Sequence, residues 1–107
     1  MDFVKRSSTY VEAVKFEGTE ESVIDLISLM NQTYDVYDLG IYEKQITIKD
    51  AGKPVKITTA FANFLTIHKE KDKKELISVP KNHYLVLTKL GLKTVNPIKF
   101  ESEYKEV

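Results

Sequence analysis

The sequence of 107 residues contains no cysteine and no tryptophan. Without cysteine the chain can form no disulfide, has no thiolate nucleophile and cannot build a zinc site from cysteine ligands. Glycine and proline are scarce, with four and three residues, and the glycines are isolated from one another. A glycine-rich phosphate loop needs several glycines close together, so no loop of that type is present. We therefore expect no cofactor.

Net charge is also lacking, since lysine plus arginine and aspartate plus glutamate number 16 each. This balance removes the overall positive field that drives binding to nucleic acid. The densest charged run, 68–75, interleaves both signs and is typical of a solvated hairpin tip. Direct nucleic-acid binding is therefore not expected.

Long apolar runs are absent, and no stretch reaches the roughly 18 residues that a membrane-spanning helix needs. The first eight residues lack the apolar segment, of about 7 to 15 residues, that a signal peptide carries. From these two features we expect no membrane partner and a cytoplasmic location.

What the chain does contain is the composition of an ordinary globular domain, with 42% hydrophobic and 30% charged residues. The length fits one domain, and we see no repeat, linker or low-complexity segment. We therefore expect residues 1–107 to form a single domain.

One segment has the signature of a helix. Thr19 offers a hydroxyl N-cap, and Glu20 and Glu21 follow where the helix dipole favours negative charge. Apolar residues then recur at three-and-four spacing as far as Met30, and Asn31 is a candidate left-handed stop. The pattern predicts a helix over about 20–31.

Most of the remaining chain alternates between apolar and polar residues, which predicts short strands. The segment 60–64 is ambiguous between a strand and a helical turn, Gly40 separates two strands, and Gly52 lies in a hairpin turn. Pro97 can begin a final helical turn that ends near Tyr104. The predicted strands are 9–16, 34–39, 45–49, 55–59, 64–68, 76–79, 84–88 and 92–95.

This order of elements predicts an α+β fold. We expect a mostly antiparallel sheet of about six to eight short strands, the 20–31 helix packed on one face, and a short C-terminal helical turn. So many short strands leave exposed edges, which could pair across a two-fold axis or be blunted by Lys and Pro. A homodimer is thus one of two open alternatives.

The densest aromatic and acidic segment is 34–43, where tyrosines alternate with acids. Tyrosine supplies a large, fairly rigid contact area with a polar tip, so this segment is a candidate protein-binding face. Alternatively, the tyrosines pack on the helix and the acids face solvent. The candidate contact residues are Tyr34, Asp35, Tyr37, Asp38 and Tyr42.

Catalytic patterns are missing. His68 and His83 are the only histidines, too few to complete a metal set without carboxylates that only folding could bring together. No Gly-Xaa-Ser-Xaa-Gly elbow occurs. We therefore expect a protein that is not an enzyme, with no catalytic residues and no metal site.

Both ends of the chain carry motifs that resemble a family of small phage and prophage proteins named after a Pro-Gly-Asp-Tyr-Gly motif. Positions 12–18 read Glu-Ala-Val-Lys-Phe-Glu-Gly, and 97–104 read Pro-Ile-Lys-Phe-Glu-Ser-Glu-Tyr. The central motif is altered, because Pro80 and Tyr84 are present while Lys-Asn-His stands between them in place of Gly-Asp. The stretch 45–60 looks like an inserted hairpin. The resemblance implies a phage accessory protein, and the family has no established activity to carry over.

Two hypotheses about function follow. The first is a non-catalytic inhibitor that binds a host protein of anti-phage defence. The alternative is a protein that sequesters a small molecule or nucleotide signal. In that case Tyr84 would stack on a base, while Lys81 or His83 would meet a phosphate.

Overall fold

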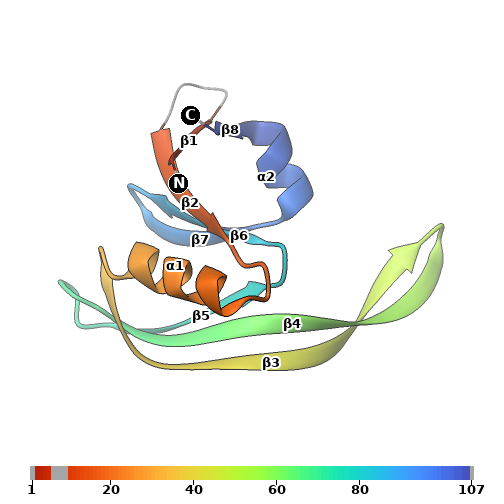
Figure 1. Cartoon of the computed structure of the whole chain (residues 1–107), viewed down its shortest axis with the longest axis horizontal. Coiled ribbons are helices and arrows are strands. Elements are labelled where there is room, and N and C mark those ends of the chain that lie inside the picture. Colours follow the sequence, from red (N-terminus) through yellow and green to blue (C-terminus); the bar gives the residue numbers. More distant parts are fainter. Residues whose placement is uncertain (1, 6–9, 107) are drawn as a thin grey trace.

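The computed structural model describes residues 2–5 and 10–106 and confirms the α+β composition (Figure 1). Thr9, where we expected the first strand to begin, lies outside this part. The elements are β1 Asp2–Lys5, β2 Tyr10–Lys15, α1 Glu20–Met30, β3 Tyr34–Asp50, β4 Lys53–His68, β5 Lys74–Pro80, β6 Tyr84–Thr88, β7 Gly91–Val95, α2 Pro97–Glu103 and β8 Tyr104–Glu106.

The strands form two antiparallel sheets, so the expectation of a single sheet was wrong. Sheet A has five strands in the order β7-β6-β2-β1-β8, and sheet B has three in the order β3-β4-β5. The chain passes from sheet B to sheet A at a tight turn between β5 and β6, where Asn82 has a φ of 70°. Sheet A combines strands from both ends of the chain, which local sequence patterns do not indicate.

Helix α1 lies between the two sheets, rather than on one face of one sheet (Figure 1). Its apolar side contributes Leu26 and Met30 to a core that also contains Phe16 of the loop after β2, Phe64 of β4 and Leu85 of β6. All five side chains are fully buried. Both sheets are therefore held together through α1.

The opposite face of sheet A is covered by α2. Alternate residues of β2 and β6 point to this side, and Val11, Ala13 and Val86 join Phe100 of α2 in a second core. Phe100 stacks on Tyr84 and Tyr104, with ring centroids 3.9 and 4.5 Å apart. The short C-terminal helix was predicted, and this aromatic stack fixes it to the sheet.

The start of α1 agrees with the sequence and its end does not. Thr19 is the N-cap and forms a capping box with Ser22, in which the Ser22 N–H donates to the Thr19 hydroxyl at 3.2 Å. Asn31 caps the C-terminus with a φ of −61°, so the expected left-handed conformation was wrong. Its N–H instead continues the helical pattern by donating to the Ile27 carbonyl.

Strands β3 and β4 have 17 and 16 residues, much longer than the short strands expected. Gly40 does not interrupt β3; a Cβ there would lie only 2.6 Å from the Tyr42 hydroxyl, so glycine leaves room for that ring. The one irregularity between the paired residues is a bulge between Val36 and Asp38. The segment 60–64 is strand, which resolves the ambiguity in the sequence.

Beyond the end of β5, strands β3 and β4 continue as a two-stranded ribbon. Pairing with β5 stops at Phe61, whereas β3 and β4 stay paired as far as Asp50 and Lys53. We call the ribbon of residues 44–59 the arm. It projects from the rest of the molecule, and both of its edges are unpaired (Figure 1). With the arm included, the longest dimension of the molecule is 45 Å.

Within the described ranges, neither helix is both long enough and apolar enough to cross a membrane.

Candidate protein-binding site

The side of sheet B that faces away from α1 is the leading candidate for a binding surface, and we call it the outer face. Residues that lie opposite one another in antiparallel strands share a face of the sheet. Because Phe64, Ala62 and Val79 point into the core, their sequence neighbours point outward. The outer face consists of three cross-strand rows, Asp38-Leu65-Leu76, Gly40-Asn63-Ser78 and Tyr42-Phe61-Pro80.

Exposed apolar side chains gather on sheet B. Among the large apolar residues that the structure shows exposed, most belong to β3, β4 or β5, and Leu76 on the outer face is 61% exposed. A concentration of this kind on a small protein marks an interaction surface more often than scattered single residues do. These residues are Tyr37, Leu39, Ile41, Tyr42, Val55, Ile57, Leu65 and Leu76.

A shallow hollow of about 170 Å³ lies in the outer face. Tyr42, Leu65 and Leu76 supply apolar walls, and Asp38 and Asn63 supply polar groups. The Asp38 carboxylate accepts the Leu39 N–H at 2.9 Å, while the Asn63 side-chain oxygen accepts the Ser78 hydroxyl. Apolar walls with a few fixed polar groups are the composition of a protein-recognition surface.

The predicted Tyr/Asp segment divides between core and surface. Asp35, Tyr37, Asp38 and Tyr42 are exposed, and the structure brings Asp38 and Tyr42 onto the outer face. Tyr34 is only 6% exposed, and its ring meets His68 edge-on at 5.0 Å between centroids. Burial, followed by a hydrogen bond and the charge of Glu75, raises the pKa of Tyr34 above its usual value. Tyr34 is thus part of the interior, as the packing alternative expected for the tyrosines.

Sequence reasoning missed Leu65 and Leu76. Leu65 lies opposite Asp38, Leu76 lies opposite Leu65 on the next strand, and both contribute walls to the hollow. The available signal was that 61–65 is apolar on both alternating faces, with Phe61 and Leu65 on one and Ala62 and Phe64 on the other. A strand that is apolar on both faces needs other parts of the protein to cover both, and in this chain only the inner face of β4 is covered.

The three predicted ligand residues are close in sequence but have separate roles. Tyr84 points toward α2, where its ring stacks on Phe100 and its hydroxyl lies 3.4 Å from Glu101. Lys15 places its ammonium 5.8 Å from the centre of the same ring. Burial, followed by the charge of Glu101, raises the pKa of Tyr84. With one side of its ring on Phe100, Tyr84 is chiefly a packing residue.

Lys81 and His83 flank the turn that connects the sheets. The Lys81 N–H donates to Ala60 at 2.8 Å, and the Phe16 N–H donates to His83 at 3.0 Å, so backbone bonds from this turn reach both β4 and the loop after β2. The Lys81 side chain lies along Gly18, where an added Cβ would be 3.2 Å from it. Neither Lys81 nor His83 lines the hollow in the outer face, the groove between β2 and α1, or the hollow between the β4–β5 and β6–β7 turns.

His68 has a structural role at the end of β4. Its Nδ1 accepts the N–H groups of Glu70 and Lys71 at 3.2 and 3.1 Å, which fixes the β4–β5 turn. In residues 2–5 and 10–106, no three His, Asp or Glu side chains come together as a metal site would require.

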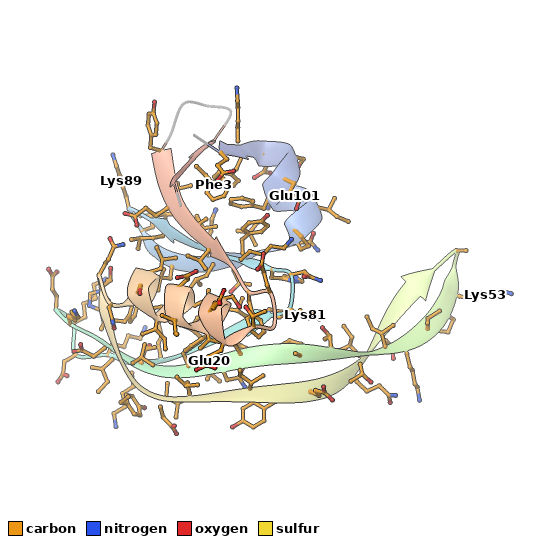
Figure 2. All side chains as sticks on the ribbon, in the orientation of Figure 1. Phe3, Glu20, Lys53, Lys81, Lys89 and Glu101 are labelled. Carbon is orange, nitrogen blue, oxygen red and sulfur yellow. The ribbon has the colours of Figure 1, made fainter. Side chains whose placement is uncertain are left out.

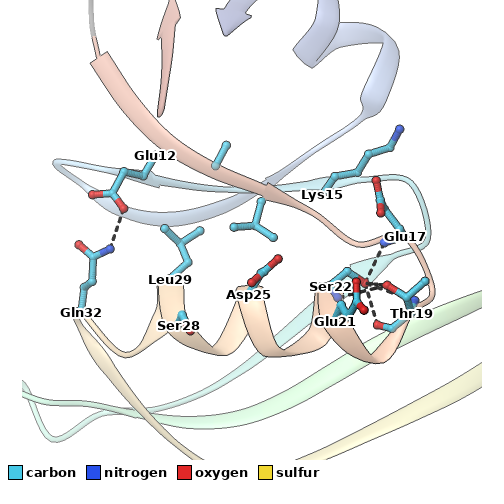
Figure 3. A pocket seen from close by; sticks show the side chains of 12 residues that line it. Glu12, Lys15, Glu17, Thr19, Glu21, Ser22, Asp25, Ser28, Leu29 and Gln32 are labelled. Carbon is cyan, nitrogen blue, oxygen red and sulfur yellow. Dashed lines mark hydrogen bonds between the residues drawn. The ribbon is translucent and has the colours of Figure 1, made fainter. Parts of the chain in front are cut away.

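A groove of about 520 Å³ separates β2 from α1 (Figure 3). Glu12, Glu17, Glu21 and Asp25 line it together with Lys15. Glu12 accepts a hydrogen bond from Gln32 at 2.8 Å, which closes one end of the groove. Its acidic lining favours a basic group over an anionic ligand.

A further hollow, of about 560 Å³, lies between the β4–β5 and β6–β7 turns, and we call it the turn hollow. Lys69, Lys71, Lys73 and Lys89 surround it, and Glu70 and Glu75 oppose them. The Lys69 ammonium is partly engaged, since it donates to the Asn31 carbonyl and lies 3.9 Å from Asp35. The remaining cations could meet an anionic ligand.

Comparison with known proteins adds no relative: no family model, no curated protein and no solved structure matches the chain.

Proposed function

We propose that this chain works by binding a protein partner, without catalysis, and that the partner is a host protein of anti-phage defence. The outer face of sheet B supplies the contact. The phage or prophage origin is supported by the motifs at 12–18 and 97–104, and the binding mode by the character of the outer face.

The observation that carries this proposal is the row Asp38-Leu65-Leu76 beside Tyr42. Leucine and tyrosine side chains held on rigid strands lose little conformational freedom when a partner covers them. Asp38 and Asp35 add negative charge on β3, which favours a basic surface on the partner. We therefore infer a partner with an apolar contact bordered by Lys or Arg.

Replacing Leu65 and Leu76 together by lysine is expected to abolish partner binding. Two buried lysines at the centre of the contact would lose apolar area and bring charges into a desolvated site. The immobilised wild-type and variant chains are incubated with lysate of infected and uninfected host cells, and captured proteins are measured by mass spectrometry. We expect the partner to fall by about tenfold or more with the variant.

Ile24→Lys provides the matched control, since Ile24 is an exposed apolar residue on α1, outside sheet B. It should capture the partner as well as the wild-type chain does. Equal capture by all three proteins, or no specific partner with any of them, contradicts the proposal. Far-UV circular dichroism confirms that each variant is folded.

The second candidate, sequestration of an anionic small molecule, is favoured by the lysines around the turn hollow. A ligand that binds only the folded chain raises its melting temperature by mass action. We expect any rise seen with a panel of cyclic and linear nucleotides to be lost with Lys89→Gln and kept with Lys81→Gln. Figure 2 shows the two lysines on different parts of the molecule, with Lys81 nearer the arm. A rise lost with Lys81→Gln instead would place the ligand at the connecting turn, and no rise contradicts this candidate.

A further inference from the structure

Strand β3 has an edge that no other strand covers. It has 17 residues and lies at the end of the order β3-β4-β5, so every second residue directs its N–H and C=O away from β4. Unpaired groups of this kind form a template on which another strand can add. The length of β3 makes this the largest such template among the described residues.

The other edges are short or guarded. The stretch of β4 on the arm that β5 does not cover, 53–60, contains Lys53, Pro54 and Lys56. β8 has three residues and β7 has five, including the exposed Lys93. β5 begins with Lys74 and ends with Pro80, which cannot donate to a ladder. Short length, lysine and proline are devices by which proteins prevent unwanted strand addition. β3 contains no proline, and its bulge lies near its start, between Val36 and Asp38.

Apolar side chains flank the open edge on both faces. Tyr42 lies on the outer face, and Leu39 and Ile41 lie on the inner face but remain 44% and 51% exposed because α1 does not cover them. An exposed edge strand with apolar residues on both faces is one that a protein chain normally pairs with another strand. The edge therefore has both the hydrogen-bonding groups and the apolar area of an interface.

We propose that β3 pairs antiparallel with β3 of a second copy, about a two-fold axis at Ile41, so that the two sheets B join into one of six strands. In this register Asp38 of each copy lies opposite Lys44 of the other, giving two symmetric ion pairs. Tyr42 lies opposite Gly40, which adds no side chain of its own, and each Tyr42 ring stays over Gly40 of its own chain. Leu39 lies opposite Glu43, and Ile41 meets its own copy.

Charge selects this register over its neighbours. A two-fold axis perpendicular to the sheet keeps each residue on its own face. Residues that lie opposite each other must then be an even number of positions apart, so the axis lies between the two copies of one residue of β3. With the axis at Gly40 or Tyr42, neither Asp38 nor Lys44 meets an opposite charge, whereas an axis at Glu43 or Lys44 sets like charges directly opposite. An axis at Tyr42 would count Asp35 opposite Lys49, but the bulge between Val36 and Asp38 puts these two side chains on opposite faces. Of these five positions, Ile41 alone therefore matches acid with base, and this self-complementarity is why the partner is a second copy.

The pairing would also stabilise the arm. A two-stranded ribbon is marginally stable by itself, and the arm leaves both edges and the half-exposed Val55 and Ile57 uncovered. In an antiparallel dimer each arm runs beside the start of the partner's β3, where Asp35 is exposed, and the arm carries Lys49, Lys53 and Lys56. Lys53, at the end of the arm, points away from the body of its own chain (Figure 2).

Dimerisation through the edge goes beyond the binding function proposed above and does not depend on it. The dimer uses backbone groups at the side of sheet B together with the Asp38 and Lys44 side chains, and it leaves Leu65 and Leu76 uncovered. The dimer would present two outer faces in one continuous surface. Consequently the Leu65→Lys, Leu76→Lys variant should lose its protein partner and remain a dimer, so the two proposals fail separately.

The absence of cysteine allows a direct test of the register. Two copies of Ile41→Cys would face each other with Cα atoms about 4.5 to 5.5 Å apart, within the range that a disulfide bridges. In the matched control, Leu39→Cys, the two thiols lie four positions apart, or about 14 Å. Under mild oxidation we expect covalent dimers with Ile41→Cys and few with Leu39→Cys, measured by non-reducing electrophoresis.

A charge exchange tests the ion pairs without a crosslink. Sedimentation equilibrium over the micromolar range should show a wild-type dimer that is weakened about tenfold or more by Asp38→Lys or Lys44→Asp, because each sets like charges opposite. The double variant restores opposite charges and should recover the dimer. A monomeric wild-type chain, equal crosslinking at 41 and 39, or no recovery in the double variant overturns the proposal.

Discussion

Replacing Phe100 by alanine is expected to destabilise the folded chain by about 3 to 5 kcal/mol, the usual cost of removing a buried aromatic ring. Phe100 is 1% exposed and lies between Tyr84 and Tyr104, with the Phe3 ring edge-on at 4.8 Å. Helix α2 has only seven residues and would be marginal without tertiary contacts. Loss of this ring therefore removes the main attachment of α2 to sheet A. Urea unfolding followed by far-UV circular dichroism measures the change.

The control for Phe100 lies in the same helix. Ile98 is 80% exposed, so Ile98→Ala changes the same helix without removing a buried side chain. Its effect should stay within about 0.5 kcal/mol. If Phe100→Ala and Ile98→Ala have equal midpoints, the aromatic stack does not hold α2 in place.

Replacing Phe64 by alanine should cost a similar amount, about 3 to 5 kcal/mol, through a different core. Phe64 is fully buried and packs in the cluster that joins α1 to both sheets. A cavity there weakens the contact between sheets A and B, so we expect unfolding of the whole chain to become easier. Chemical denaturation gives the free energy, and amide exchange shows which elements open.

Leu65→Ala is the matched comparison, because Leu65 is the next residue and points to the outer face. Since successive residues of a strand face opposite sides, this variant should be much less destabilised than Phe64→Ala. Equal losses would mean that the outer face is packed rather than open, and would contradict the binding surface as well. Amide exchange adds a second distinction: Phe100→Ala should expose β1, α2 and β8 first, whereas Phe64→Ala should affect both sheets.

The elements that the sequence predicted well are those specified by neighbouring residues. Helix α1 begins at Glu20, directly after its N-cap Thr19, because the cap, the two acids and the apolar spacing all agree. The hairpin turn at Gly52 has a φ of 79°, a conformation that glycine adopts without strain. The strand pairs around this turn and around the charged run before β5 are likewise local.

The features that sequence reasoning missed depend on distant partners. Division into two sheets follows from β2 pairing with β6, about seventy residues along the chain, as in the pair Glu12 and Leu87. β1 and β8 are too short to give a periodic signal. Gly40 is compatible with a strand because the Tyr42 ring fills its empty side, a contact that composition does not reveal.

The candidate site was predictable only in part, because some of its residues are set by local alternation and others by distant contacts. Alternation identifies residues that share a face, so Asp38 and Tyr42 could be grouped from the sequence. It does not say which face the helix covers, and hence neither the burial of Tyr34 nor the exposure of Leu65 and Leu76 could be read from it. Only the position of α1 between the sheets decides this.

The composition of sheet A has a consequence for biosynthesis. β2 is made early, yet its neighbour β6 comes from the last quarter of the chain, and β1 pairs with β8 at the opposite end. Sheet B, by contrast, consists of consecutive strands joined by tight turns. On the ribosome, sheet A can be completed only after the final strand has emerged, whereas the hairpins of sheet B can pair while translation continues.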